Sequence, residues 1–152
     1  MPKQSAGILL YRKVEGQLQV FLVHPGGPFF KNKDDGAWSI PKGEFLDDEN
    51  GLVAAKREFE EETGQRIDGD FKQLSPIKIK SGKLIRAWAI EGDIDHTTIT
   101  SNLFEMEWPP HSGKMVSFAE VDRAAWFDTA TAKLKINAGQ VNLIAELETI
   151  IT

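Results

Sequence analysis

A row of glutamates in one predicted helix constrains this chain more than any other feature. Residues 57–64 read REFEEETG, and the closing glycine is a common helix terminator. An α-helix turns by about 100° per residue, so Glu58, Glu61 and Glu62 fall on one face. An apolar stripe runs beside that face and contains Leu52, Ala55 and Phe59. Such a helix can pack on a core while it presents carboxylate oxygens to a cleft.

Three carboxylates within one helical turn have two interpretations. Like charges at this spacing cost roughly 0.2–0.5 kcal/mol per pair in an isolated helix. A hard divalent cation such as Mg²⁺ reverses that penalty, because it prefers oxygen ligands and shares its sites with substrate phosphates. The ordinary alternative is an acidic helix face that is simply solvated, and the three glutamates alone leave both interpretations open.

The wider stretch, residues 43–64, resembles the Nudix box, G-x5-E-x7-R-E-U-x-E-E-x-G-U, in which U is apolar. Eight specified positions match: Gly43, Glu49, Arg57, Glu58, Phe59, Glu61, Glu62 and Gly64. The last apolar position departs from the pattern, since it holds Gln65, with Ile67 two residues further on. The box covers 22 residues. The Nudix domain that it implies would cover residues 1–152 as a single domain.

The resemblance implies a metal-dependent hydrolase that cleaves a diphosphate linkage in a nucleoside diphosphate joined to another group. Glu58, Glu61 and Glu62 would hold Mg²⁺ or Mn²⁺, which lowers the pKa of a bound water and neutralises phosphate charge. In the family, a backbone carbonyl at the position of Lys42 often joins the metal ligands. Four further box residues would support the architecture of the site rather than its chemistry: Gly43, Glu49, Arg57 and Gly64.

The segment before the box helix supplies two candidate substrate contacts, Lys42 and Glu44. The Lys42 ammonium could meet a phosphate, or it could be a solvated lysine, and the sequence does not separate these readings. The pair Lys42-Gly43 is familiar in relatives that cleave dinucleoside or diphosphoinositol polyphosphates. It is a weak indication of substrate class.

A glutamate outside the box is expected to orient or deprotonate the attacking water, together with the box glutamates. Glu120 fits loosely, because family members often carry a Glu a few residues before a Trp on a late strand. Glu105 and Glu107 are alternatives, since they share one face of a predicted strand that is otherwise rich in aromatic residues. The sequence alone does not choose among the three.

The order of elements predicts an α/β architecture with a mixed sheet between helices, which agrees with the Nudix-like α/β/α sandwich. Alternating or continuous apolar runs predict strands over residues 5–12, 18–24, 71–80, 83–91, 101–110 and 115–118. Besides the box helix, a short helix capped by Asp128 or Thr129 should run to about residue 133, and a last helix should cover residues 138–150.

Composition excludes several classes of protein. The 152 residues include 41% hydrophobic and 27% charged residues, as in an ordinary globular protein, and no cysteine, which excludes disulfides and thiolate metal sites. The net charge of −5 supplies no basic excess for nucleic acid. A capped or triphosphate RNA end is the one nucleic-acid substrate that stays open. No membrane-spanning run or signal peptide is visible, so we expect a cytoplasmic protein.

Two rival functions remain at this stage. One is a non-catalytic nucleotide-binding Nudix module, and the other is an interaction domain with an incidental acidic helix. Among substrates, dinucleoside polyphosphates, nucleoside triphosphates and nucleotide sugars all stay open, and the oligomeric state is not specified. The histidines form no zinc pattern. His24, His96 and His111 are each expected to be turn or surface residues.

Overall fold

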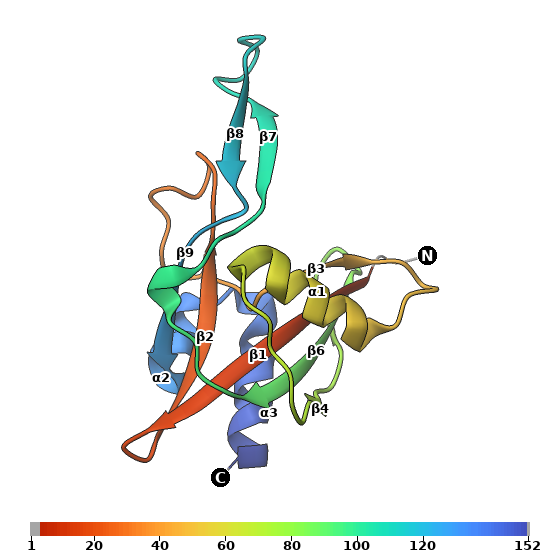
Figure 1. The fold of residues 1–152 in the computed structure, drawn as a ribbon, viewed down its shortest axis with the longest axis vertical. Helices are drawn as coiled ribbons and strands as arrows, with labels where there is room; N and C mark the ends of the chain where they lie inside the picture. The colour runs from red at the N-terminus through yellow and green to blue at the C-terminus, as the bar shows by residue number, and fades with distance from the viewer. Residues whose placement is uncertain (1–3, 152) are drawn as a thin grey trace.

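The computed structural model describes residues 4–151, and its centre is a twisted mixed β-sheet (Figure 1). The principal strands are ordered β4-β6-β1-β2-β9, with β3 added to β1 and β5 added to β6. Only the β1–β6 pair is parallel among the strand pairs of the described chain. The strands of this sheet are β1 (Gln4–Val14), β2 (Gln17–Pro25), β3 (Lys42–Phe45), β4 (Lys72–Gln73), β5 (Ile77–Lys78), β6 (Leu84–Glu91) and β9 (Val121–Asp128).

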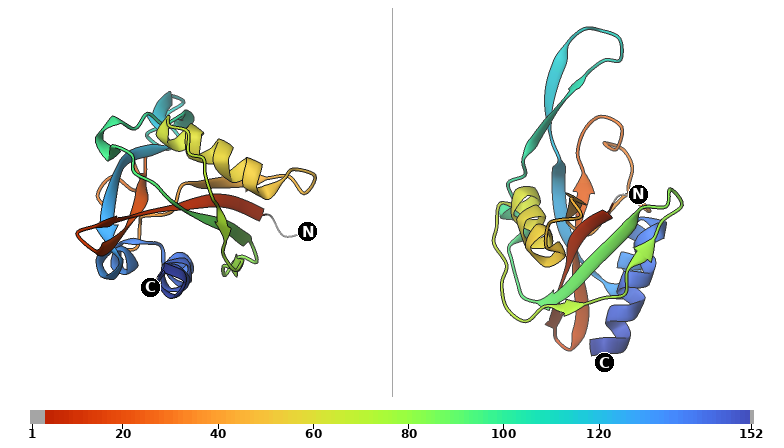
Figure 2. Two further views of the ribbon diagram at one scale, coloured as in Figure 1. Left: turned by 60° about the horizontal axis from the view of Figure 1, so that its bottom comes forward. Right: turned by 90° about the vertical axis from the view of Figure 1, so that its right-hand side faces the viewer.

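Helices cover both faces of the sheet (Figures 1 and 2). One face packs against α1 (Gly51–Thr63), and its core contains Ile8, Phe21 and Phe59. The opposite face packs against α2 (Thr129–Lys135) and α3 (Val141–Ile151), which follows the 3₁₀ turn η2 (Ala138–Gln140). Because β1 and β2 are buried on both sides, they read as nearly continuous apolar runs in the sequence. The predicted α/β sandwich is therefore confirmed.

A separate two-stranded hairpin stands out from the sheet (Figures 1 and 2). It consists of β7 (Leu103–Glu107) and β8 (Met115–Ala119), and it follows the 3₁₀ turn η1 (His96–Thr98). One face of the hairpin meets the loop of residues 26–37, where the rings of Phe29 and Trp108 lie edge to face at 5.5 Å. The sequence predicted both strands, but not that they leave the main sheet.

Two predicted elements differ from the structure. The expected strand over residues 71–80 is instead two short strands, β4 and β5. Pro76 has no N–H for the ladder, and the N–H of Ser75 is bonded to the carboxylate of Glu146, so the chain leaves the sheet edge there. The expected last helix is divided between η2 and α3. Between residues 4 and 151, no helix is long and apolar enough to cross a membrane.

Candidate functional site

The ends of α1 are fixed by caps that place its glutamates. The side chain of Asn50 accepts a hydrogen bond from the N–H of Val53, which satisfies an unpaired donor at the helix start. Gly64 ends the helix in the left-handed conformation with φ of 75°, and its N–H bonds to the carbonyl of Glu60 at 2.7 Å. A side chain at position 64 would also meet the carbonyl oxygen of Thr100 at 2.8 Å.

Glu58 is the most enclosed of the α1 glutamates that form ion pairs, with a side chain 12% exposed. Its carboxylate lies directly against Gly43 on β3. A Cβ atom at position 43 would approach Glu58 Cδ to 2.1 Å, closer than any real contact. Glycine is needed at this position because any other residue would displace the carboxylate.

Arg57 ties the glutamates to the loop that precedes α1. Its guanidinium bonds to the carboxylate of Glu49, and it lies 3.3 Å from Glu58 Oε1 and 3.8 Å from Glu61 Oε1. One cation therefore contacts three carboxylates. The arrangement holds the loop and the helix in register and offsets part of the repulsion among the acidic groups.

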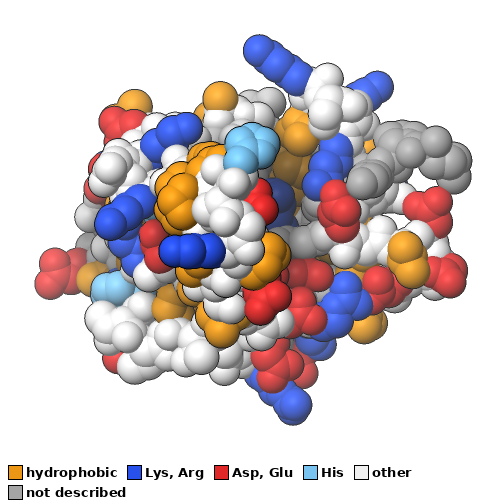
Figure 3. All heavy atoms as spheres, turned by 90° about the horizontal axis from the view of Figure 1, so that it is seen from above, with side chains coloured by type: hydrophobic (Ala, Val, Ile, Leu, Met, Phe, Trp, Pro, Cys, Tyr) orange, Lys and Arg blue, Asp and Glu red, His pale blue; other side chains and the backbone are white. Residues whose placement is uncertain are grey.

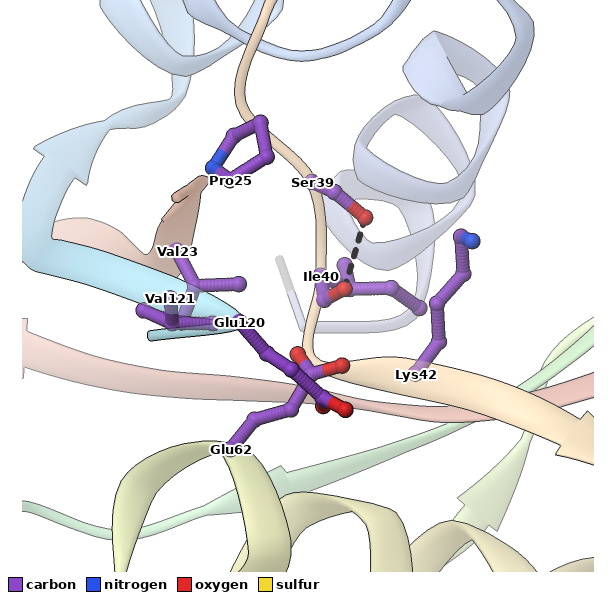
Figure 4. A pocket seen from close by; sticks show the side chains of 8 residues that line it. All are labelled: Val23, Pro25, Ser39, Ile40, Lys42, Glu62, Glu120 and Val121. Atoms are coloured by element: carbon purple, nitrogen blue, oxygen red, sulfur yellow. Dashed lines mark hydrogen bonds between the residues drawn. The ribbon is translucent and has the colours of Figure 1, made fainter. Parts of the chain in front are cut away.

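Glu120 approaches the box from the other side of a pocket, at the bend between β8 and β9. Figure 4 shows the carboxylates of Glu62 and Glu120 pointing toward one another across this pocket, whereas the side chain of Lys42 runs away from them. The pocket has a volume of about 150 Å³ and is lined by Val23, Pro25, Ser39, Ile40, Lys42, Glu62, Glu120 and Val121. Seen from above, acidic side chains gather near the centre of the surface, beside a hollow (Figure 3).

A relay of backbone hydrogen bonds sets the position of Glu120. The N–H of Asn102 donates to the carbonyl of Glu61 at 2.9 Å, and the carbonyl of Asn102 accepts from the N–H of Glu120 at 2.8 Å. The carbonyl of Glu120 in turn accepts from the N–H of Gly26 at 2.9 Å. The end of α1, the segment directly before β7, the bend before β9 and the residue after β2 are thus linked through main-chain atoms.

The pKa values of the carboxylates show what this enclosure costs. Burial raises the pKa of Glu62 to about 8, with further upward contributions from Glu58 and Glu120. The pKa of Glu58 is raised by burial and by the charge of Glu61. The pKa of Glu120 is raised by the same two causes. Carboxylates from two separate parts of the chain therefore share one electrostatic environment in which a negative charge is unfavourable.

Lys42 and Glu44 lie on β3, where they pair with Gly7 and Ser5 of β1. Burial lowers the pKa of Lys42, and the charge of Lys83 lowers it further. The backbone of Lys42 forms a hydrogen bond with the Glu62 carboxylate, so this residue touches the site through its main chain. Glu44 forms an ion pair with Lys83 at 2.9 Å and does not line the pocket.

The structure separates the three glutamates that the sequence left open. Glu107 accepts hydrogen bonds from the N–H groups of His111 and Gly113, so it closes the turn of the projecting hairpin. Glu105 is exposed on β7. Glu120 alone among these three lines the pocket. No spacing in the sequence could reveal this, because the relay through Asn102 is a tertiary contact.

The prediction for His24 was wrong. Its side chain is fully buried rather than placed in a turn or at the surface, and it bonds to Asp122 and to the carbonyl of Lys33. The expected turn begins after β2 ends at Pro25. The apolar run that precedes the histidine was the available signal, since the strand it predicts continues through position 24.

The residues of the pocket suit a hard cation by their chemistry. Carboxylate oxygens are the ligands that Mg²⁺ and Mn²⁺ prefer, and several carboxylates are enclosed here at the cost of raised pKa values. Over residues 4–151, however, no group of three or more His, Asp or Glu side chains is already arranged to hold a metal ion. The carboxylate oxygens are thus suitable ligands for such an ion, but their side chains do not converge on a common coordination site.

Comparisons with known proteins agree with this architecture. The family model described as NUDIX domain matches residues 1–147. No curated protein matches the chain significantly. The NUDIX domain of Shewanella oneidensis NrtR, complexed with ADP ribose, aligns with a TM-score of 0.69 and 18% identity over 100% of this chain and 90% of that one.

Two further solved structures have the same fold. An Ap4A hydrolase from C. elegans aligns with a TM-score of 0.66 and 18% identity over 97% of each chain. A mutT/nudix family protein from Listeria innocua gives 0.64 and 17% over 99% of this chain and 95% of that one. At these identities the structural matches establish the fold, and the family model covers nearly the whole sequence. The chain belongs to the NUDIX domain family.

Proposed function

We propose that this protein is a Mg²⁺- or Mn²⁺-dependent hydrolase of a phosphoanhydride bond in a nucleoside diphosphate linked to another group. The observation that carries the proposal is the meeting of Glu62 and Glu120 in one pocket, next to the other glutamates of α1. These carboxylates come from separate parts of the sequence; the charge of Glu120 contributes to the raised pKa of Glu62, and the charge of Glu61 to that of Glu120. A solvated acidic face would not be enclosed in this way.

The proposed roles follow from position. Glu58, Glu61 and Glu62 would hold the metal ions, with the backbone carbonyl of Lys42 as a further ligand. A bound divalent ion neutralises phosphate charge and makes hydroxide available near neutral pH. Glu120, which lines the same pocket as Glu62, would orient the attacking water or accept its proton.

The support residues of the box are assigned by their contacts. Gly43 makes room for the Glu58 carboxylate, and Gly64 ends α1 against Thr100. Glu49 and Arg57 join the preceding loop to the helix. Glu44 forms an ion pair with Lys83 and does not line the pocket. The Lys42 ammonium is therefore the stronger candidate for a contact with a substrate phosphate.

The substrate class is inferred from shared chemistry. ADP ribose, bound by the NrtR domain, and Ap4A, after which the C. elegans hydrolase is named, both contain a nucleoside diphosphate linked to a second group. A cleft lined by carboxylates requires cations between itself and such an anion. We therefore propose this class of substrate, with nucleoside triphosphates and capped RNA ends as the related compounds to compare.

The test is an assay of the purified protein with Mg²⁺, with Mn²⁺ and with EDTA. The panel contains diadenosine polyphosphates, common and oxidised nucleoside triphosphates, ADP ribose, a nucleotide sugar and capped RNA, each scored by product identity. We expect metal-dependent cleavage of one class, with a nucleoside monophosphate or diphosphate among the products. Binding of a nucleotide without turnover, under any of the metal conditions, would instead support a non-catalytic module.

Two variants of α1 separate the site from the general acidity of the helix. Glu61→Gln should lower turnover by about 100-fold or more with little change in folding, because its side chain is 38% exposed. Glu60→Gln is the matched control, since Glu60 lies on the same helix and pairs with the exposed Arg66 instead. Full activity in Glu61→Gln would overturn the proposed mechanism.

A further inference from the structure

His24 is a fully buried, polar residue beside the proposed site, and both of its ring nitrogens are engaged. Nδ1 lies 2.8 Å from Asp122 Oδ1, and Nε2 lies 2.6 Å from the carbonyl oxygen of Lys33. The ring packs edge to face on Trp38, with centroids 5.2 Å apart. His24 therefore joins β2, β9 and the loop of residues 26–37 at one point.

The chemistry of the two partners fixes the protons on the ring. A backbone carbonyl has no hydrogen to donate, so Nε2 must carry the proton in its bond to Lys33. The Asp122 carboxylate is 32% exposed and forms an ion pair with the guanidinium of Arg123 at 3.9 Å. An ionised carboxylate also only accepts. Nδ1 must then donate too, which makes the ring an imidazolium in this conformation.

An irregularity in the sheet brings Asp122 to the ring. The pairing of β2 with β9 runs regularly until His24 meets Arg123, and then Pro25 meets Val121. Asp122 is thus an extra residue on β9, as in a β-bulge, a device that redirects a side chain. In a regular ladder Asp122 would be paired with Pro25; in the bulge it lies against His24 instead.

The held loop is directly connected to the pocket. Its two flanks supply the pocket residues Pro25 and Ser39, and its first residue, Gly26, donates to the carbonyl of Glu120. The bond from His24 holds the middle of the same loop at Lys33. A change in the hydrogen bonds of the ring can therefore affect Glu120 by two routes. One is the loop, and the other is the backbone from Asp122 to Glu120, which lies two residues earlier in the chain.

We propose that His24 is a positioning residue for Glu120: as an imidazolium it holds the loop of residues 26–37 against β9, and it releases the loop when it loses a proton. This inference rests on the proposed function for its effect on catalysis, but the release itself does not. The charged groups around the ring are Asp122 and Arg123 on β9, Lys33 and Asp34 in the loop, and Lys135 on α2, which pairs with Asp34. Asp122 is the charged group among these that the ring touches.

The sign of the pH effect follows from the two bonds. Below the titration of the ring, both bonds are intact and the loop is held. As the pH rises through that titration, either the bond to Asp122 or the bond to Lys33 loses its proton. We expect amide exchange in residues 26–37 to accelerate about tenfold or more over that pH range, as befits the loss of a charge-assisted hydrogen bond.

The direct test is nuclear magnetic resonance of the whole protein. The ring nitrogens of His24, assigned by their absence in His24→Gln, should both carry protons at low pH. Their titration should coincide with the increase in exchange of the loop amides. The exposed His96, in the 3₁₀ turn η1, provides an internal control, because its titration should leave the loop unchanged.

Asp122→Asn is the decisive variant, because an amide can satisfy a neutral ring. The Asn side chain can donate to Nδ1 while Nε2–H still donates to Lys33, so every bond survives without the extra proton. The loop should stay protected at all pH values. We expect the kcat of the wild type to fall at alkaline pH with little change in KM, and the variant should lack that fall. An Asp122→Ala variant, which cannot donate, should expose the loop at every pH.

Two results would overturn the proposal. One is a His24 ring that carries a single proton in the folded protein at low pH. The other is a loop whose exchange follows the same pH course in wild type and in Asp122→Asn. Both readouts are independent of activity, so a protein that fails every hydrolase assay would still support or refute the role of His24 in holding the loop.

Discussion

The two walls of the cleft are built in different ways. The box wall, residues 42–64, is a continuous segment in which a strand, a loop and a helix follow one another. The far wall combines the end of β2, residues 23–26, with residues 120–122, and its members are joined across 98 residues by the contact between His24 and Asp122. The box wall contributes Lys42 and Glu62 to the pocket lining, whereas the far wall contributes Glu120 and the apolar side chains of Val23, Pro25 and Val121.

This difference has a physical basis. In the box wall, helix geometry fixes the spacing of Glu58, Glu61 and Glu62, so a local sequence pattern determines their relative positions. In the far wall, the position of Glu120 depends on the backbone relay through Asn102 and Gly26. The first arrangement requires particular side chains, and the second requires particular main-chain contacts. Variants should therefore affect the two walls by different routes.

The largest expected effect tests whether the far wall contributes to chemistry at all. Glu120→Gln keeps the size of the side chain but removes its capacity to accept a proton. We expect kcat to fall by about 100-fold to 10,000-fold, with the fold intact, in a steady-state assay on the cleaved substrate. Glu105→Gln, on the projecting hairpin, is the matched control and should leave kcat unchanged. An unaltered kcat in Glu120→Gln would assign the chemistry to the box wall alone.

The next effect tests the packing of the box wall. Gly43→Ala places a methyl group where the Glu58 carboxylate now lies, at 2.1 Å from its Cδ. Because the carboxylate must move, we expect a loss of about 100-fold in kcat/KM and a weaker affinity for Mg²⁺ in calorimetric titration. Gly92→Ala, where a Cβ atom would meet only the ends of the Ile67 and Leu10 side chains at 3.2 Å, serves as the comparison for the general effect of replacing glycine. Equal affinities for Mg²⁺ in the two variants would contradict this view of Gly43.

A third experiment concerns the stability of the metal-free protein. The folded-state pKa of Glu62 is about 8, above its ordinary value of 4.5, so the folded protein holds that proton more tightly than the unfolded chain does. The corresponding stability is fully present below pH 4.5 and is lost as the pH rises through about 8. In EDTA we expect the unfolding free energy to fall by about 1–3 kcal/mol between pH 5 and pH 9, measured by thermal or urea denaturation.

Glu62→Gln and added Mg²⁺ sharpen that experiment. The variant should lose a large part of the pH dependence, because the amide does not ionise. Added Mg²⁺ should raise Tm more at pH 9 than at pH 5, since it binds the ionised carboxylates. A wild-type Tm that changes no more with pH than the Tm of Glu62→Gln would show that enclosure of this carboxylate does not strain the box wall.

The smallest effect is expected from the contact that supports the box wall from outside. Glu49→Gln removes a charge from the ion pair with Arg57 but leaves a hydrogen-bond acceptor. Because Arg57 is 41% exposed and retains Glu58 and Glu61 as neighbours, we expect a loss of stability of about 1 kcal/mol or less and a decrease of a few-fold in kcat. A Lys56→Gln variant, which breaks the exposed pair with Asp68, is the control. A larger loss of stability or kcat in Lys56→Gln than in Glu49→Gln would show that the ion pair between Glu49 and Arg57 gives the site no particular support.

The sequence predicted the box wall more completely than the far wall. The helix α1 ends at Gly64 as expected, and its first turn is capped by Asn50, the residue directly before the helix. These features depend on neighbours within a few residues. The choice among Glu105, Glu107 and Glu120 could not be made, because it depends on where a hairpin leaves the sheet. For His24, the apolar run before it predicted a strand through position 24, but its partner Asp122, 98 residues further along the chain, could not be identified from the sequence.

The apolar patterns identified most strands but not their lengths or partners. The runs in β1 and β2 were recognisable because both sides of these strands are buried. The segment from residue 71 to residue 80 contains the same residue types, yet a single proline divides it at the sheet edge. The hydrophobic pattern indicates which side chains are buried, whereas strand pairing depends on backbone N–H and C=O groups, which are the same in every residue except proline.

The relay from Glu61 through Asn102 and Glu120 to Gly26 has a consequence for how such a site can diverge. Its hydrogen bonds use only peptide groups, so mutation at position 102 can exchange one side chain for another without moving Glu120. Proline is the exception there, because it has no N–H to give. Position 26 is stricter, since a Cβ atom would lie 1.9 Å from the carbonyl oxygen of Ala119. The shape of the far wall therefore depends on the side chain at position 26 and not on the one at position 102.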